Sequence, residues 1–571
     1  MGGEWKKKII SIAVSCISVL VWLLILRKSQ ADKLIYLFCA FCSLSPSFMC
    51  ILKKEVMGHT LKRKGVVFLS LIFSFLITGS NYNLFRENTD TINTIKGILL
   101  FASTMVVMYN ALKVLYFIFV SFEYKEYHYS EKDKVFSFLI PFLFCLLLDW
   151  IYLFLVAYPG NLTTDSMAQI GNIVSGKYSN HHPFYHTLMI KACIDMATFM
   201  GAGVNTGVLL YSIFQSVLLS AIFAYAVRTM CEVGIPRWVL LIVSALYALL
   251  PYHWVYSVTM WKDVVFGGAV LCFIITLYRC RCSIGNEKAN FIMLFLSALG
   301  FMLLRSNGLY AFILVIISLI YSDYHNKKRI MWVAIGAFLI AVIMRGPVLE
   351  YNHVTQPDTA ESLSVPLQQV ARYICEDGPL NEEEYALLNS VMDVSQVKEK
   401  YQDWISDPIK NLVRDRGGNA IISDNKLAFL KLWIDLGVKQ PESYVSAWVD
   451  LTKAYLNSSY SNGMIFYNGI VDNEYGIVRE VRSEMLNSLV VRIEEAIRDE
   501  IITAIGLCVW LYIIGFGFSI LNDRKSYLEC LPLLAIVLSL LVATPVSNEF
   551  RYVYALFTSI PMVGVIVLRK K

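Results

Sequence analysis

Charged side chains are scarce in this chain. Asp, Glu, Lys and Arg make up 16% of its 571 residues, and hydrophobic residues make up 57%, whereas about a quarter of an average soluble domain is charged. Apolar runs of about 20 residues, the length that crosses a bilayer, recur along the chain. The composition therefore excludes an ordinary soluble domain and predicts a membrane protein with many spans.

Nucleotide-binding and metal-binding motifs are also missing. The sequence has no GxxxxGK[ST] loop and no GxGxxG that follows a strand, which argues against a nucleotide-activated substrate. It has no DxD motif, and its 13 cysteines form neither a paired CxxC metal site nor a disulfide framework. We therefore expect a metal-independent protein without a cofactor.

The apolar runs predict about fourteen transmembrane helices. We place them at residues 9–26, 34–52, 65–80, 97–121, 135–157, 206–227, 238–257, 264–279, 290–304, 308–322, 330–345, 501–522, 527–543 and 551–568. The first run has no small-x-small cleavage site after it, so we expect a retained span and not a signal peptide. If the helices alternate, basic segments such as 53–64, 279–288 and 569–571 share one side, which the positive-inside rule assigns to the cytoplasm. Both termini are then cytoplasmic.

This topology divides the chain into four parts. We expect an N-terminal four-helix membrane module (1–134), a membrane core (135–345) with an outer loop (158–205), an extracytoplasmic domain (346–500) and a C-terminal three-helix membrane segment (501–571). The extracytoplasmic domain holds 25 acidic and 14 basic residues, and an acidic outer domain agrees with basic inner loops.

Local patterns predict helices in the polar parts. Asn381 opens a helix with a capping-box pattern, and the apolar periodicity of 425–437 predicts a helix that stops at Gly437. A second helix is expected from Pro441 to about 457. The run 187–201, inside the outer loop, is expected to lie as an amphipathic helix on the outer face.

The outer ends of the predicted helices collect ionisable residues from five separate segments. Charged groups at membrane depth are costly and usually face a cavity or a partner, so this set predicts a shared polar site. Each member also has a simpler explanation, for example Asp165 as the N-cap of a short helix or Arg305 as a side chain that reaches the interface. The set consists of Asp165, His181, His182, Lys262, Asp263, Arg305, Arg345, Glu549 and Arg551.

These residue types suit a base beside a phosphate. A partly desolvated carboxylate such as Asp165 can act as a general base, with its pKa raised toward the working pH. Lys and Arg bind phosphate, Arg through its bidentate fork. A base beside a phosphate-binding cluster at the outer membrane surface predicts a lipid-phosphate substrate.

The order of short motifs resembles that of the GT-C superfamily of integral membrane glycosyltransferases. More closely, the chain resembles an uncharacterised bacterial family of GT-C-like proteins, over roughly residues 135–568. The motifs are PG-x4-D-S at 159–166, HHP at 181–183, WKD at 261–263, SVPLQQVAR at 364–372 and NEFRY at 548–552. The chain departs from some GT-C branches because its first outer loop lacks an adjacent Asp-Glu pair.

The resemblance implies an inverting transfer of a hexosyl or pentosyl group from a polyprenyl-phosphate donor. The acceptor would be a surface glycan, a teichoic-acid-like polymer or a lipid at the outer face, with no nucleic acid involved. Asp165 would deprotonate the acceptor hydroxyl. The donor would be bound by His181, His182, Lys262, Asp263, Arg305, Arg345, Glu549, Arg551 and Tyr552. The acceptor side would include Gln368, Gln369 and Arg372, which also fit an ordinary amphipathic helix.

Three other functions stay open. A flippase for a lipid-linked glycan would use the same cations to bind pyrophosphate and predicts broken helices, a midplane site and an inverted repeat, yet the sequence shows no internal repeat. A polymerase or ligase of lipid-linked glycans would need the same outer face. A receptor or structural protein would use its outer domain to bind a partner.

Overall fold

Helices form all the regular elements of the described chain. The structure, a computed structural model, describes residues 2–26, 37–44, 60–86, 91–458, 463–543 and 545–569. Within these ranges the loops meet in isolated β-bridges and no strand is formed. Most of the predicted helix 34–52 and part of the basic segment 53–64 lie outside the described residues.

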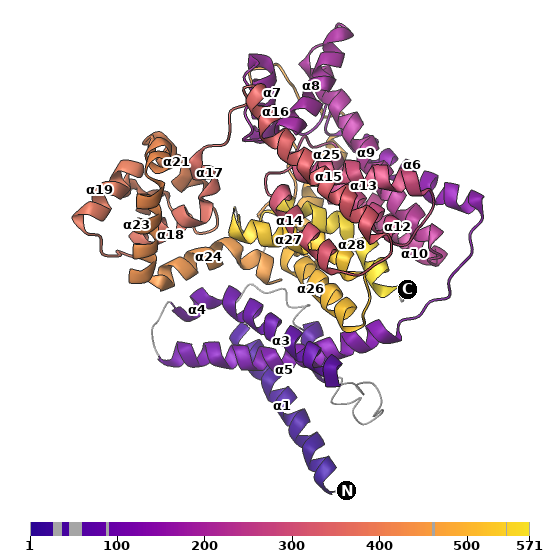
Figure 1. The fold of residues 1–571 in the computed structure, drawn as a ribbon, viewed down its shortest axis with the longest axis vertical. Helices are drawn as coiled ribbons and strands as arrows, with labels where there is room; N and C mark the ends of the chain where they lie inside the picture. The colour runs from indigo at the N-terminus through magenta and orange to yellow at the C-terminus, as the bar shows by residue number, and fades with distance from the viewer. Residues whose placement is uncertain are drawn as a thin grey trace.

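Seven helices of the described chain are long and apolar enough to cross a membrane (Figure 1). They are α3 (Thr60–Ser80), α5 (Thr91–Ser121), α6 (Glu131–Leu155), α9 (Val204–Glu232), α12 (Lys262–Arg281), α15 (Lys327–Arg345) taken with α16 (Pro347–Tyr351), and α28 (Tyr554–Leu568) taken with the 3-10 turn Phe550–Val553 before it. An eighth span exists if α10 (Arg237–Leu249) and α11 (Pro251–Ser257), which meet at a bend of 55°, cross together.

Shorter apolar helices accompany these spans. They include the apolar part Ile10–Leu26 of α1 (Gly2–Leu26), α14 (Gly308–Tyr321), α26 (Ile505–Leu521) and α27 (Tyr527–Val542). The prediction of a helical membrane protein is confirmed. The predicted total of fourteen spans exceeds the set of long helices and stays a prediction.

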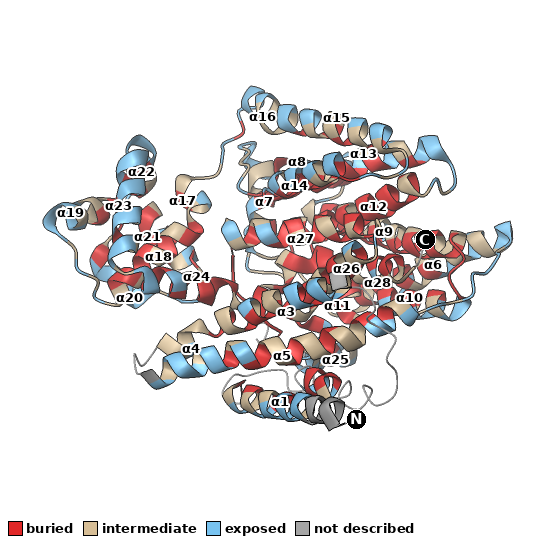
Figure 2. Ribbon diagram, turned by 60° about the horizontal axis from the view of Figure 1, so that its bottom comes forward, coloured by how far each residue is buried: buried red, intermediate tan, exposed pale blue. Residues whose placement is uncertain are grey.

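Helix α12 lies at the centre of the membrane helices (Figure 2). Of its apolar stretch 94% is buried, against 28% for α6 and 22% for α15. Gly267 allows α28 to approach closely, because a Cβ there would lie 2.9 Å from the Tyr554 ring. This packing brings Lys262, the first residue of α12, beside the segment that precedes α28.

The polar connecting elements gather at one end of the helices. Short helices α7 (Thr164–Ser175) and α16 (Pro347–Tyr351) lie at that end, and the C-terminus lies at the other (Figure 2). Helix α8 (Phe184–Phe199) buries Ile190 and Ile194 in a small core with α9 and exposes Phe199. It is not among the long spans, and its position on the outer face stays a prediction.

A lobe of small helices packs around its own core, formed by residues between Ala360 and Tyr444. We call α17 to α24, Thr359–Leu456, the helical lobe. Its helices are α17 (Thr359–Ser362), α18 (Ser364–Cys375), α19 (Glu382–Val391), α20 (Val397–Lys400), α21 (Asp407–Asp415), α22 (Gly418–Asp424), α23 (Lys426–Lys439) and α24 (Pro441–Leu456).

Two predictions about this lobe have opposite outcomes. The capping box is confirmed, because the Asn381 side chain accepts from the Glu384 backbone N–H at 2.8 Å and Glu384 accepts from the Asn381 N–H at 3.0 Å. The helix stop at Gly437 is wrong, since α23 continues to Lys439. Gly437 instead makes room for the Tyr444 ring, which a Cβ would approach to 2.9 Å.

The segment after the lobe returns to the membrane helices. We call residues 463–483 the strap. Gly469 accepts from the Leu162 backbone N–H at 2.9 Å and donates to the Asn161 side chain at 3.1 Å. The strap leads into α25 (Glu484–Ile497), and Ile465 and Val490 belong to the membrane core. The predicted domain 346–500 therefore consists of the helical lobe and a separate strap with its following helix.

The N-terminal module packs on both the helical lobe and the C-terminal helices. Arg86, which ends α4 (Tyr82–Arg86), makes two contacts of 2.8 and 2.5 Å with the Glu376 carboxylate of the lobe. Asn457, directly after α24, donates to Ser80 at the end of α3 at 3.0 Å. The helical lobe is thus tied to the Ser80 end of α3.

A buried ion pair near the other end of α12 provides a test of the fold. Arg281 contacts Glu529 through two bonds of 3.0 and 3.1 Å, and the Glu529 side chain is fully buried. Glu529→Ala should cost roughly 3–5 kcal/mol because it leaves a buried guanidinium without its partner. The measurement is thermal unfolding of the detergent-purified protein.

The matched control is Glu287→Ala, which breaks an exposed pair with Arg329 and should cost at most about 1 kcal/mol. Equal shifts in melting temperature for the two variants would contradict this account of the fold.

Candidate functional site

Asp165 lies in the first turn of α7, whose start is tied to the segment before α12. Ser166 accepts from the Thr163 backbone N–H at 3.1 Å and donates to the Met260 carbonyl at 2.8 Å. The Trp261 indole donates to the Thr163 hydroxyl at 2.8 Å. Thr163, and not Asp165, occupies the N-cap position. The interpretation of Asp165 as a helix cap is therefore wrong, and its carboxylate is available for other contacts.

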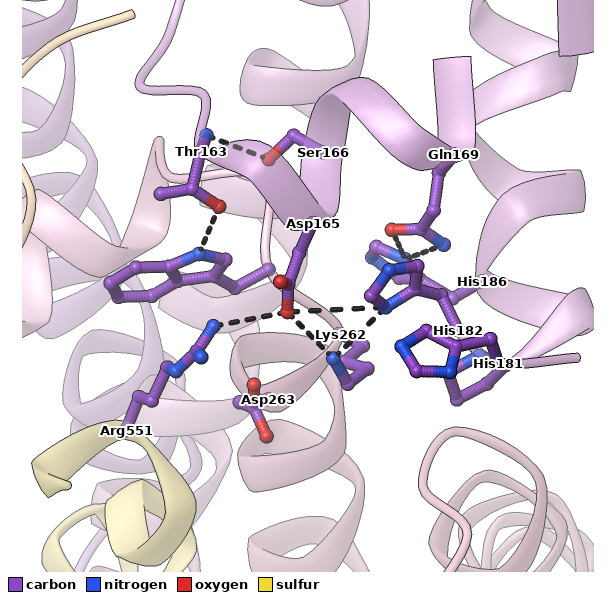
Figure 3. Close-up of polar contacts among 12 residues, drawn as sticks. Thr163, Asp165, Ser166, Gln169, His181, His182, His186, Lys262, Asp263 and Arg551 are labelled. Carbon is purple, nitrogen blue, oxygen red and sulfur yellow. Dashed lines mark hydrogen bonds and ion pairs between the residues drawn. The ribbon is translucent and has the colours of Figure 1, made fainter. Parts of the chain in front are cut away.

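One carboxylate oxygen of Asp165 collects three partners from three distant segments (Figure 3). Its Oδ2 lies 2.9 Å from Lys262 Nζ, 3.0 Å from Arg551 Nη1 and 3.9 Å from His182 Nδ1. Lys262 Nζ also lies 3.3 Å from His182 Nδ1. We call these four residues the Asp165 cluster. Of the predicted shared polar site, the structure thus brings Asp165, His182, Lys262 and Arg551 into direct contact.

Aromatic rings and a second acid hold Arg551 in this position. Arg551 belongs to the 3-10 turn Phe550–Val553, which leads into α28. Its guanidinium lies 5.3 Å from the centre of the Trp261 ring, a distance at which a cation is attracted to the ring face. Its Nε lies 3.0 Å from Glu549 Oε1. Burial raises the pKa of the Glu549 carboxyl, which the Arg551 charge opposes.

The electrostatics of Asp165 differ from the prediction. Burial alone would raise the pKa of its carboxyl, but the charges of Lys262 and Arg551 outweigh burial and hold that pKa well below its usual value. The expected rise toward working pH is thus wrong for the observed arrangement. Asp165 is ionised, and its basicity is suppressed by the cations that touch it.

His182 is neutral, and a neutral imidazole can accept a hydrogen bond. Burial, with the Lys262 charge adding to it, lowers the pKa of the His182 imidazole from 6.5 to about 3. The neutral ring therefore accepts from Lys262. His186, one turn further, is a structural residue that contacts the Tyr211 hydroxyl at 2.6 Å and Gln169 at 2.9 Å. His181 is exposed and packs edge-on against His182.

A second ion pair lies directly beneath the Asp165 cluster. Asp263 is fully buried, and its Oδ1 lies 3.1 Å from Arg305 Nη1. That guanidinium stacks over the Tyr552 ring at 4.4 Å and donates to the Tyr552 carbonyl at 2.8 Å. Arg305 thus holds the turn that carries Arg551. Its contacts are with Asp263 and Tyr552, and it does not contact Asp165.

The sequence of this chain matches a known family. The family model, described as a family of unknown function (DUF6020), covers residues 174–571. The chain belongs to this family. No curated protein and no solved structure matches it. The match includes His182, Lys262, Arg305 and Arg551, but it begins inside α7, after Asp165. The acid at the centre of the site thus lies in the part that the match leaves out.

Four predicted site residues of this family member make contacts elsewhere. Arg345 donates to the carbonyl groups of Met302 and Ser306 at 3.3 and 3.0 Å. The acceptor-side candidates bond within the helical lobe: Gln368 to the Gln402 carbonyl, Gln369 to Tyr444 and Trp433, and Arg372 to Glu376 and Asp450. These contacts fit the simpler interpretation of an amphipathic helix, and the acceptor role stays a prediction.

Sequence reasoning missed the residues that hold the loop of Asp165 in place. Asn161 is fully buried and donates to Tyr152 at 2.9 Å while it accepts from Gly469 of the strap. No local pattern could join Asn161 to a segment 308 positions away. Trp261 was visible only as part of the WKD motif. Among the described residues, no group of three His, Cys, Asp or Glu side chains is placed to hold a metal ion.

The neutral state of His182 predicts a pH dependence of stability. Because its pKa is about 3 in the folded protein and 6.5 ordinarily, the unfolded chain binds the proton more readily, and this contribution is fully present above pH 6.5 and is lost as pH falls toward 3. The melting temperature should therefore fall between about pH 7 and about pH 4, and fall less in His182→Gln, which keeps an acceptor for Lys262.

The control is His181→Gln, on the exposed neighbouring ring. It should keep the wild-type pH dependence, including the part that His186 contributes with the same sign. If His182→Gln and wild type lose stability equally on acidification, His182 is not held neutral as described.

Proposed function

We propose that this protein is a membrane glycosyltransferase of the GT-C type, with Asp165 as general base. It transfers a hexosyl or pentosyl group from a polyprenyl-phosphate donor to a cell-surface glycan or lipid acceptor. The supporting observation is that one carboxylate oxygen meets Lys262 Nζ at 2.9 Å and Arg551 Nη1 at 3.0 Å. A base and two phosphate-binding cations thus lie within reach of one reacting centre.

In the proposed reaction, Asp165 accepts the proton of the acceptor hydroxyl. The acceptor oxygen bonds to the anomeric carbon as the bond from that carbon to the donor phosphate oxygen breaks, so the configuration inverts. The electron pair stays on the departing phosphate, where Lys262 and Arg551 stabilise the added charge. His182 is placed beside Lys262 to contact the phosphate or the sugar.

The low pKa of Asp165 fits this role if the cations change partner. A donor phosphate that draws Lys262 and Arg551 onto its own oxygens removes the two charges that lower the pKa of Asp165. Burial, which acts in the opposite direction, then dominates and raises the basicity of the carboxylate. Donor binding would in this way activate the base.

The proposed orientation follows the charge distribution. The end that carries α7, α16 and the helical lobe is extracytoplasmic in this proposal, and both termini are cytoplasmic, with up to fourteen spans in total. The helical lobe would help to choose the acceptor. The reaction would need no metal or other cofactor.

A flippase for a lipid-linked glycan is the second candidate, because one observation favours it. Helices α10 and α11 are broken by 55°, and broken helices are typical of transporters. The ionisable cluster, however, lies at the first turns of α7 and α12 and not at this break. Its position favours chemistry at the outer face.

The decisive variant is Asp165→Asn, which keeps the shape of the side chain and cannot act as a base. Loss of a general base typically costs about 10²–10⁴-fold in rate. In a strain that lacks the protein, the wild-type copy should restore a specific sugar on the surface glycan, and Asp165→Asn should not. The measurement is surface-glycan composition at matched protein levels.

The control is Asp195→Asn, the same change at an exposed acid of α8 that pairs with Lys191, and it should behave as wild type. Restoration of the sugar by Asp165→Asn would remove the general base from the proposal and favour transport. If the missing component is a whole repeat unit and not one sugar, a polymerase or flippase explains the site better.

A further inference from the structure

An apolar cavity of about 390 Å³ lies between α3, α26 and α27. On α3 its lining residues are spaced at the helical repeat, with Gly65, Leu69, Ile72 and Leu76 on one stripe. The residues of α26 and α27 that face this stripe are likewise glycine or apolar. Apolar cavities of this kind exclude water and accept hydrocarbon.

The cavity is elongated and opens toward the bilayer. From Gly65 to Leu76 the stripe extends about 16 Å along the helix at the usual rise per residue. Phe68 and Leu538 line the cavity and are also 62% and 52% exposed. Its opening therefore lies on the outside of the helices, where a hydrocarbon chain can enter sideways from the membrane.

One end of the cavity adjoins the loop that carries Arg551. Leu456, the last residue of α24, and Leu541, in the last turn of α27, line that end. Tyr455, next to Leu456, donates its hydroxyl to the Val546 carbonyl at 2.8 Å. Five residues after Val546 comes Arg551, which contacts Asp165. A chain in the cavity would thus point its head toward the Asp165 cluster.

We propose that this cavity holds the prenyl chain of the donor, so that the N-terminal module forms one wall of the lipid site. The inference rests on the proposed function, which requires a lipid with an exposed phosphate. Phospholipid acyl chains are also apolar, but the direction of the cavity toward two phosphate-binding cations favours a lipid whose head is a phosphate. It also gives a role to α3, which lies outside the family match.

Chain-length preference tests the proposal. The full-length protein in detergent is titrated with undecaprenyl monophosphate and with geranyl monophosphate, whose chain is too short to fill the cavity. Wild type should bind the long-chain lipid more tightly. Ile72→Trp, which fills the cavity, should weaken undecaprenyl monophosphate binding about tenfold and leave geranyl monophosphate binding unchanged. Leu76→Phe is a milder second variant near the Leu456 end.

The matched control is Val67→Trp, on the exposed side of α3, which should change neither affinity. Arg551→Gln should weaken both lipids, because both carry the phosphate. Equal binding of the two lipids by wild type, with both weakened by Arg551→Gln, would overturn the cavity proposal and leave the phosphate site. No effect of Arg551→Gln would overturn the proposed function as well. Competition by phosphatidylglycerol as effective as that of undecaprenyl monophosphate would show a general bilayer-lipid site and overturn the assignment to the donor.

Discussion

A partly buried carboxylate at the end of a helix bundle is stabilised by pairing, and the pairing of Asp165 is the interaction on which the site depends. The effective cost of burying an unpaired ion is several kcal/mol. Lys262 and Arg551 offset this cost only if the start of α12 and the turn before α28 both lie within hydrogen-bond distance of α7. The hydrogen bond from Trp261 to Thr163 and the close packing of α28 at Gly267 hold these elements in that position.

Charge balance extends beyond this contact. Three carboxylates and three cations share the site: Asp165, Asp263, Glu549, Lys262, Arg305 and Arg551. In the proposed reaction the departing phosphate gains one negative charge, while Asp165 loses one by taking a proton. The total charge of the site then stays constant through the transfer. A base placed inside a balanced cluster therefore also limits the electrostatic cost of releasing the product.

The sequence could predict the apolar helices, the polar loop of Asp165 and the main members of the site, because each rests on a local signal. The length of the apolar runs indicates the spans, and a charged side chain at the end of a predicted helix indicates Asp165, Lys262 and Arg551. It could not separate Arg305 from Arg345, which look alike in sequence, yet Arg305 meets Asp263 and Arg345 meets backbone carbonyls. The pKa of Asp165 was misjudged because Lys262 and Arg551 were assigned to a substrate phosphate, whereas in the structure both cations contact Asp165 directly.

The boundary of the family match has a physical consequence. Residues 174–571 contain Lys262 and Arg551 but neither Asp165 nor the α3 wall of the apolar cavity. Without Asp165 the two cations would face each other across a partly buried site with one fewer negative charge, which is destabilising. Without α3 the apolar stripes of α26 and α27 would lose the helix that covers them. The matched region is therefore not a self-sufficient unit in this chain, because both its charge balance and its packing are completed by residues that precede it.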